Sequence, residues 1–74
     1  MVKNYLFDKQ TKTEIGQELW RLRHERHLYL KNVSTQTHIP YKIIDSMELG
    51  KSVQYSSLRK LMDFYGKRVK VILD

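Results

Sequence analysis

The chain has 74 residues and a formal net charge of +6, because fourteen Lys and Arg face eight Asp and Glu, and it contains no cysteine. This length predicts one domain, and the lack of cysteine excludes disulfides and thiolate metal sites. The basic excess favours nucleic acid over a membrane surface as the partner. Since no apolar run approaches the ~20 residues of a membrane span and no signal peptide opens the chain, we expect a cytoplasmic protein without membrane association.

The N-terminal third predicts an arm followed by a helix. Residues 1–10 are expected to form an arm or a short strand, since "VKNYLF" is rich in β-prone and aromatic residues. "TEIGQELWRLRHER" predicts a helix with apolar residues at helical spacing on one side. Thr11, as half of a capping box, or Thr13 is expected to begin this helix. Trp20 lies one step off the apolar line and is expected to cover the edge of the core, or the strand pair, rather than to bind a ligand.

Two short helices are predicted next, separated by a tight turn. "LKNVSTQT" predicts the first, and "YKIIDSMEL" predicts the second, in which Ile44 and Met47 face the core. Pro40 cannot continue the first helix but can open the second. Gly50 follows the second helix, where a residue in the left-handed conformation is favoured.

The C-terminal third predicts one more helix and a strand. "SSLRKLMDFY" predicts a helix that Ser56 or Ser57 caps, so that the helical core spans residues 12–66. The tail then alternates with a period of two, which predicts a strand over residues 68–73. A lone strand leaves its backbone groups unpaired, so it must pair with the N-terminal segment or with a second copy. We favour a homodimer held by Val69, Val71, Ile72 and Leu73.

Small and apolar residues, together with a few charged ones, recur through these helices at ordered spacings. They are Ile15-Gly16, Leu19, Leu22-Arg23, Leu28, Val33, Ser34, Ile39, Ile44, Met47 and Glu48-x-Gly50-Lys51. This ordered set, from about Ile15 to Gly66, resembles the Cro/CI-type helix-turn-helix DNA-binding domain, also called lambda-repressor-like or XRE. The usual Thr-Gln opening of the family's second helix is replaced by Tyr29-Leu30.

The resemblance implies a fold, a partner and one structural pair. The fold would be mainly α, with four to five helices and a short C-terminal β-strand. The helix Tyr41–Leu49 would lie in the major groove of double-stranded DNA, and dimers would bind half-sites about one DNA turn apart. Arg23 would pair with Glu48 inside the domain. The chain would act as a transcriptional regulator, namely a repressor that occludes a promoter.

Four residues of the groove helix are candidates for base reading. Lys42 can donate to guanine O6 and N7, and Ser46 can bond to either base type. Tyr41 can bond to phosphate or lie against a thymine methyl group. Asp45 can accept from cytosine N4, although a carboxylate beside phosphates more often acts as a repulsive filter. For each of them, the alternative is an exposed or half-packed side chain without a DNA role.

A second set is expected to contact phosphates, which fixes the register of the protein on the duplex. Tyr29 stands near the start of the second helix, and Lys51 follows the groove helix directly. Lys31 and Arg59 rank behind them. Each is also open to the simpler interpretation of a solvated surface residue.

The sequence contains no pattern typical of an enzyme, a cofactor site or a metal site. His24, His27 and His38 are not spaced with carboxylates as metal ligands usually are, and no glycine-rich phosphate loop occurs. We therefore expect neither catalysis nor a cofactor. Two alternatives to a DNA-binding repressor remain. One is a protein-interaction module that grips its partner through Leu30, Tyr41 and Ile43, and the other is the antitoxin of a toxin pair.

Overall fold

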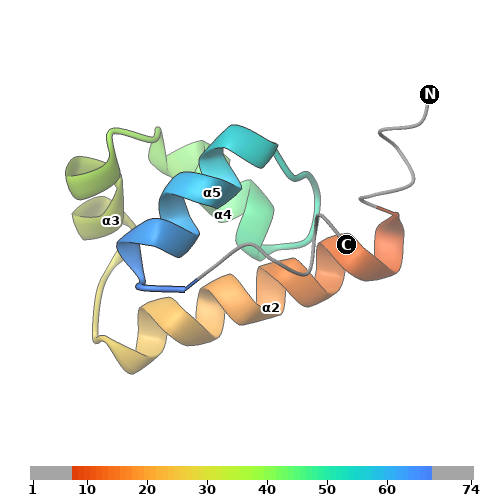
Figure 1. Ribbon diagram of the computed structural model, residues 1–74, viewed down its shortest axis with the longest axis horizontal. Helices are drawn as coiled ribbons and strands as arrows, with labels where there is room; N and C mark the ends of the chain where they lie inside the picture. The colour runs from red at the N-terminus through yellow and green to blue at the C-terminus, as the bar shows by residue number, and fades with distance from the viewer. Residues whose placement is uncertain (1–7, 68–74) are drawn as a thin grey trace.

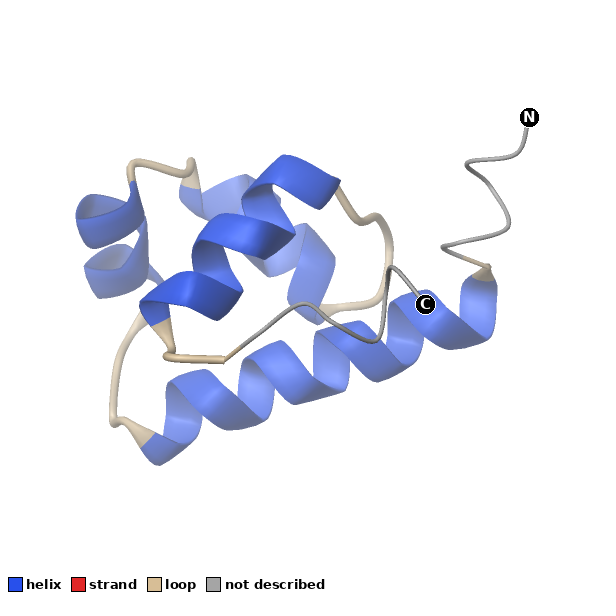
Figure 2. Ribbon diagram, in the orientation of Figure 1, coloured by secondary structure: helices blue, strands red, loops and turns tan. Residues whose placement is uncertain are grey.

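The computed structural model describes residues 8–67, which form four helices and the loops between them (Figures 1 and 2). The helices are α2 (Lys9–Glu25), α3 (Leu30–Thr37), α4 (Tyr41–Glu48) and α5 (Tyr55–Phe64). The predicted mainly helical class is confirmed. The predicted strand over 68–73 and most of the predicted arm, residues 1–7, lie outside the described residues. None of the helices in the described part is both long and apolar enough to cross a membrane.

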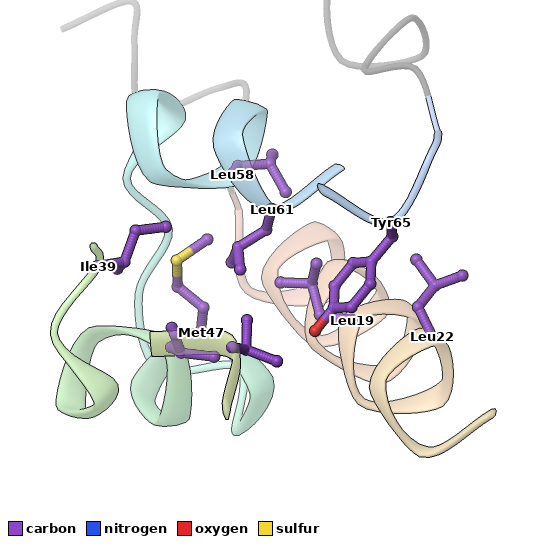
Figure 3. Close-up of a cluster of buried hydrophobic side chains, with 9 residues drawn as sticks. Leu19, Leu22, Ile39, Met47, Leu58, Leu61 and Tyr65 are labelled. Atoms are coloured by element: carbon purple, nitrogen blue, oxygen red, sulfur yellow. The ribbon is translucent and has the colours of Figure 1, made fainter. Parts of the chain in front are cut away.

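The three shorter helices pack together beside α2, the longest helix (Figure 1). α4 packs against both α2 and α3, and α5 packs against α3. Figure 3 shows the core that this arrangement encloses, to which all four helices contribute. The buried hydrophobic residues are Leu19, Leu22, Val33, Ile39, Ile44, Met47, Leu58, Leu61 and Tyr65. Ile44 and Met47, the residues of α4 expected to face the core, are both among them.

The start of α2 differs from the prediction. Asp8 caps the helix, and its carboxylate accepts a hydrogen bond of 2.8 Å from the Thr11 amide. This bond lowers the pKa of Asp8, because it stabilises the charged form. The predicted caps Thr11 and Thr13 both lie inside α2, and the Thr13 hydroxyl donates to the Lys9 carbonyl at 3.0 Å. A carboxylate is a strong acceptor at the positive end of a helix, so the polar residues after Asp8 extend α2 toward the N-terminus.

The start of α5 also differs from the prediction. The N-cap is Gln54, and both proposed caps, Ser56 and Ser57, lie inside the helix. The Ser57 hydroxyl instead donates to the Gln54 side-chain carbonyl at 3.3 Å. Ser57 is buried, so this contact satisfies its hydroxyl at the edge of the core.

Left-handed residues end the helices. Gly50 has a φ of +76°, and Lys51 donates to the Ser46 carbonyl at 3.0 Å, which is the predicted end of α4. α2 ends in the same way with a non-glycine residue. His27 has a φ of +55°, and Leu28 donates to the Arg23 carbonyl at 3.2 Å. A side chain at such a φ is strained, so His27 ends α2 less favourably than glycine would.

Gly16 allows α2 and α4 to approach closely. A Cβ atom at this position would lie 2.5 Å from the Met47 carbonyl oxygen and 2.7 Å from that of Glu48. Both distances are too short for real contacts, and both neighbours are backbone atoms. The absence of a side chain at Gly16 therefore sets the distance between α2 and the C-terminal end of α4.

Arg26, just after α2, connects that helix to the end of α5. Its guanidinium donates to the Leu22 carbonyl at 2.9 Å and to the Tyr65 carbonyl at 2.7 Å. It also lies 5.2 Å from the centre of the Tyr65 ring. Trp20, expected to cover the edge of the core or the strand pair, is half exposed and stacks on His24, with ring centres 3.7 Å apart.

Candidate nucleic-acid interface

The turn from α3 into α4 is fixed by side-chain hydrogen bonds. The Ser34 hydroxyl donates to the Ile39 carbonyl at 2.6 Å, and the Ile39 side chain is buried in the core. The Thr37 hydroxyl donates to the Val33 carbonyl at 2.7 Å and accepts from the Ile39 amide at 3.3 Å. His38 turns the chain with a φ of +62°. These contacts hold the two short helices in one relative orientation.

The C-terminal end of α4 is held to α2 by Arg23 and Glu48. The Arg23 Nε lies 2.8 Å from Glu48 Oε2, and its Nη2 lies 2.8 Å from Glu48 Oε1, so the pair is bidentate. The remaining nitrogen, Nη1, donates to the Leu28 carbonyl at 3.0 Å. The side chains are only 10% and 3% exposed, and the bonds to Glu48 raise the pKa of Arg23. The pair expected from the sequence is thus present, and it is internal.

The opposite side of α4 faces solvent. Tyr41 is 55% exposed, and Lys42 and Asp45 are exposed as well, while Ile44 and Met47 are buried. Neither Lys42 nor Asp45 forms an ion pair within residues 8–67. Three of the four predicted base-reading residues are therefore exposed on one helix with polar groups that the described residues leave unbonded.

Ser46, the fourth candidate, has a different environment. It is partly buried, and its hydroxyl lies 3.0 Å from that of Ser52, in the loop that follows α4. This bond ties α4 to the loop and takes up one of the hydrogen bonds that the Ser46 hydroxyl can form. Leu49, which the sequence analysis did not select, is 60% exposed at the end of α4. Its spacing of four from Asp45 was the available signal, since residues four apart share a helix face.

The predicted phosphate-binding residues lie near the ends of α3 and α4. Tyr29 is the N-cap of α3 and is 75% exposed, while Lys31 is exposed in the first turn. Lys51 is exposed immediately after Gly50. Asn32, which the sequence analysis missed, accepts a 2.9 Å hydrogen bond from the Tyr29 amide and so fixes the start of α3. Arg59 is exposed on α5, and no hydrogen bond or ion pair among the described residues links it to the other three.

Charge is distributed unevenly over these elements. Two of the three ion pairs in residues 8–67 join Arg21 to Glu18 and Glu25, all on α2. These pairs also raise the pKa of Arg21. The third pair is internal. The lysines on α3, on α4 and in the following loop therefore keep uncompensated charge, which suits a polyanionic partner.

No cluster of three or more His, Asp or Glu side chains suited to a metal ion occurs in the part of the chain that the structure describes. The predicted dimer residues Val69, Val71, Ile72 and Leu73 lie outside that part. Comparison of the chain with protein-family models, curated proteins and solved structures found no match.

Proposed function

We propose that the protein is a sequence-specific DNA-binding transcriptional regulator, in which α3 and α4 form a helix-turn-helix unit. In this proposal α4 enters the major groove, with Tyr41, Lys42 and Asp45 toward the base edges. The sequence resemblance to Cro/CI-type domains suggested this role. The fixed turn and the internal Arg23–Glu48 pair support it, because a reading helix must be held rigidly to present its side chains.

One observation carries the proposal: two exposed lysines that no described carboxylate neutralises come before and after α4 along the chain. Lys31 lies in the first turn of the helix before it, and Lys51 in the loop after it. The major groove is bordered by phosphates on both sides, so a groove-binding helix needs cations before and after it. The bond between Ser46 and Ser52 would fix the second of these segments relative to the helix.

The regulator is proposed to act as a dimeric repressor that occludes a promoter. A two-fold axis would present two α4 helices to half-sites about one DNA turn apart. The predicted strand over 68–73 supplies a means of dimerisation by pairing with its twin. An antitoxin that represses its own promoter is compatible with the same DNA-binding unit.

Selection of genomic fragments by the purified full chain tests the proposal. An enriched common sequence is expected, and the logarithm of its binding constant should fall linearly with the logarithm of salt concentration, by about 0.9 per phosphate neutralised. Lys51→Gln should lower this slope by roughly one phosphate, whereas Lys60→Gln, the matched change on α5, should not. Binding without sequence preference, or binding that ignores salt, would contradict the proposal.

A protein-interaction module is the second candidate, and it is favoured by exposed apolar surface at Tyr29 and Leu49. Two of the three residues first expected to grip a partner, Leu30 and Ile43, are partly buried and pack against the core. Only Tyr41 of the three is largely exposed, so the exposed apolar surface is smaller than the sequence predicted. This candidate predicts tight binding to a protein partner, with an affinity that changes little between low and physiological salt.

A further inference from the structure

Asp45 is an acidic residue on a surface that should be cationic. It is exposed on α4 beside Lys42, and the other α4 carboxylate, Glu48, is bound to Arg23. A carboxylate that approaches phosphates weakens their attraction to the protein. The Asp45 side chain makes no hydrogen bond or ion pair within residues 8–67, and its favourable interaction there is a longer-range attraction to Arg23. The Asp45 carboxylate is therefore free to accept a hydrogen bond from another molecule.

Lys42 and Asp45 are spaced for an ion pair that they do not form. Glu18 and Arg21 on α2 have the same spacing of three and are paired at 2.6 Å. The order of charge differs between the two helices. An acid before a base suits the helix dipole, whereas α4 carries the base first, at its positive end. The side chains of Lys42 and Asp45 are thus left free to bond to another molecule.

The separation of Lys42 and Asp45 along the helix is somewhat larger than, but comparable with, the spacing of DNA base pairs. Residues three apart on a helix differ by about 4.5 Å along the axis. Successive base pairs are about 3.4 Å apart. In the major groove a lysine donates to guanine O6 and N7, and a carboxylate accepts from cytosine N4. One residue provides only donors and the other only acceptors, so the two select different bases.

We propose that Lys42 and Asp45 read neighbouring base pairs, with Lys42 on a guanine and Asp45 on a cytosine. The preferred site would then contain a guanine and a cytosine at adjacent positions. Ser46 is assigned no base, because it is partly buried and its hydroxyl is already bonded to Ser52. This inference rests on the proposed DNA-binding function.

The experiment is a randomised-site selection with the full chain and with Asp45→Asn. Asparagine bonds to adenine N6 and N7, so the preferred base at one position should change from cytosine to adenine, by about tenfold, while the other positions stay the same. Lys42→Gln should independently change the neighbouring guanine to adenine, because glutamine makes the same contact. Asp63→Asn, an equal change on an exposed position of α5, should leave the preferred site unaltered.

The outcomes of this experiment distinguish failure of the base readout from failure of the proposed DNA-binding function. If Asp45→Asn binds every sequence more tightly without a change of preferred base, Asp45 is a repulsive filter and the inference is wrong. If both variants keep the wild-type preference while their thermal unfolding is unchanged, the readout is likewise overturned. If Asp45→Asn fails to fold, Lys42→Gln still tests the adjacent guanine. A wild-type chain that selects no sequence would instead refute the proposed function itself.

Discussion

The hydroxyl of Tyr65 is a polar atom inside the hydrophobic core. The residue is only 3% exposed, and residues 8–67 offer its hydroxyl no hydrogen-bond partner. Figure 3 shows the oxygen pointing into the cluster of buried hydrophobic side chains. An unpaired buried hydroxyl costs about 1–3 kcal/mol, so Tyr65→Phe should stabilise the domain by roughly 1 kcal/mol in urea unfolding. A loss of stability would mean that the hydroxyl has a partner.

The same hydroxyl should make stability depend on alkaline pH. Burial raises the pKa of Tyr65 from 10.0 to about 12, because the anion is poorly solvated in the core. Between these values the folded state holds the proton more tightly than the unfolded state does, so stability falls as pH rises through that range. The wild type should lose roughly 2 kcal/mol relative to Tyr65→Phe by pH 12. Parallel stability curves for the two proteins from pH 10 to 12 would argue against a raised pKa.

Two histidines adopt a conformation that favours glycine. His27 and His38 have φ values of +55° and +62°, and both are exposed. A left-handed backbone costs a non-glycine residue about 1–2 kcal/mol, of which the greater flexibility of glycine in the unfolded chain offsets part. His27→Gly and His38→Gly should each raise stability by roughly 0.5–1 kcal/mol. His24→Gly, the same change inside α2, should lower it by roughly 0.3 kcal/mol through helix propensity, and the lost stacking on Trp20 adds to this loss. Thermal unfolding of the three variants checks both signs.

At the scale of elements, the attachment of α4 to α2 rests on the Arg23–Glu48 pair. Replacing either residue alone with alanine leaves a buried charge without its partner, which costs about 3–5 kcal/mol. The double variant loses both charges and should be less unstable than the sum of the single variants. A double-mutant cycle measured by urea unfolding provides the test. Additive losses would mean that the two side chains do not interact in solution.

The close approach of α4 to Gly16 leads to a second prediction about α2 and α4. Alanine normally stabilises a helix relative to glycine, by about 0.5–1 kcal/mol. At Gly16 its Cβ would collide with two α4 carbonyl oxygens, so Gly16→Ala should destabilise the domain by about 1–3 kcal/mol. Gln17→Ala, at the exposed next position, is the control and should have little effect. A stabilised Gly16→Ala protein would show that α2 and α4 can separate without cost.

The elements that could be predicted from the sequence are those with a strong apolar period. α3 and α4 are short, but their bounds could be predicted closely from their apolar residues, the turn between them and Gly50. The beginnings of α2 and α5 could not be predicted, because their first turns are polar and several residues there can act as caps. The pairing of Ser46 with Ser52 was equally hidden, since it depends on the path of the loop between them. The DNA contacts and the family resemblance remain predictions.

At the scale of the whole molecule, the predicted strand over 68–73 determines the expected assembly. An exposed strand of this apolar, β-branched character invites pairing, and pairing with its twin forms a two-fold interface. We expect the full chain to sediment as a dimer, and a chain truncated after Gly66 to sediment as a monomer with weaker DNA binding. A full chain that stays monomeric would favour pairing of the two termini within one chain.

Arg26 has a consequence for such a dimer. By binding the carbonyls of Leu22 and Tyr65, it anchors the residue at which the chain leaves α5. The tail therefore departs from a fixed origin on the rigid body formed by the helices. If the tails of two copies pair, the fixed position of Tyr65 sets the distance between the two α4 helices of the dimer. Arg26→Ala removes this attachment. The variant should therefore bind half-sites at several separations with similar affinity, while its preferred bases stay the same.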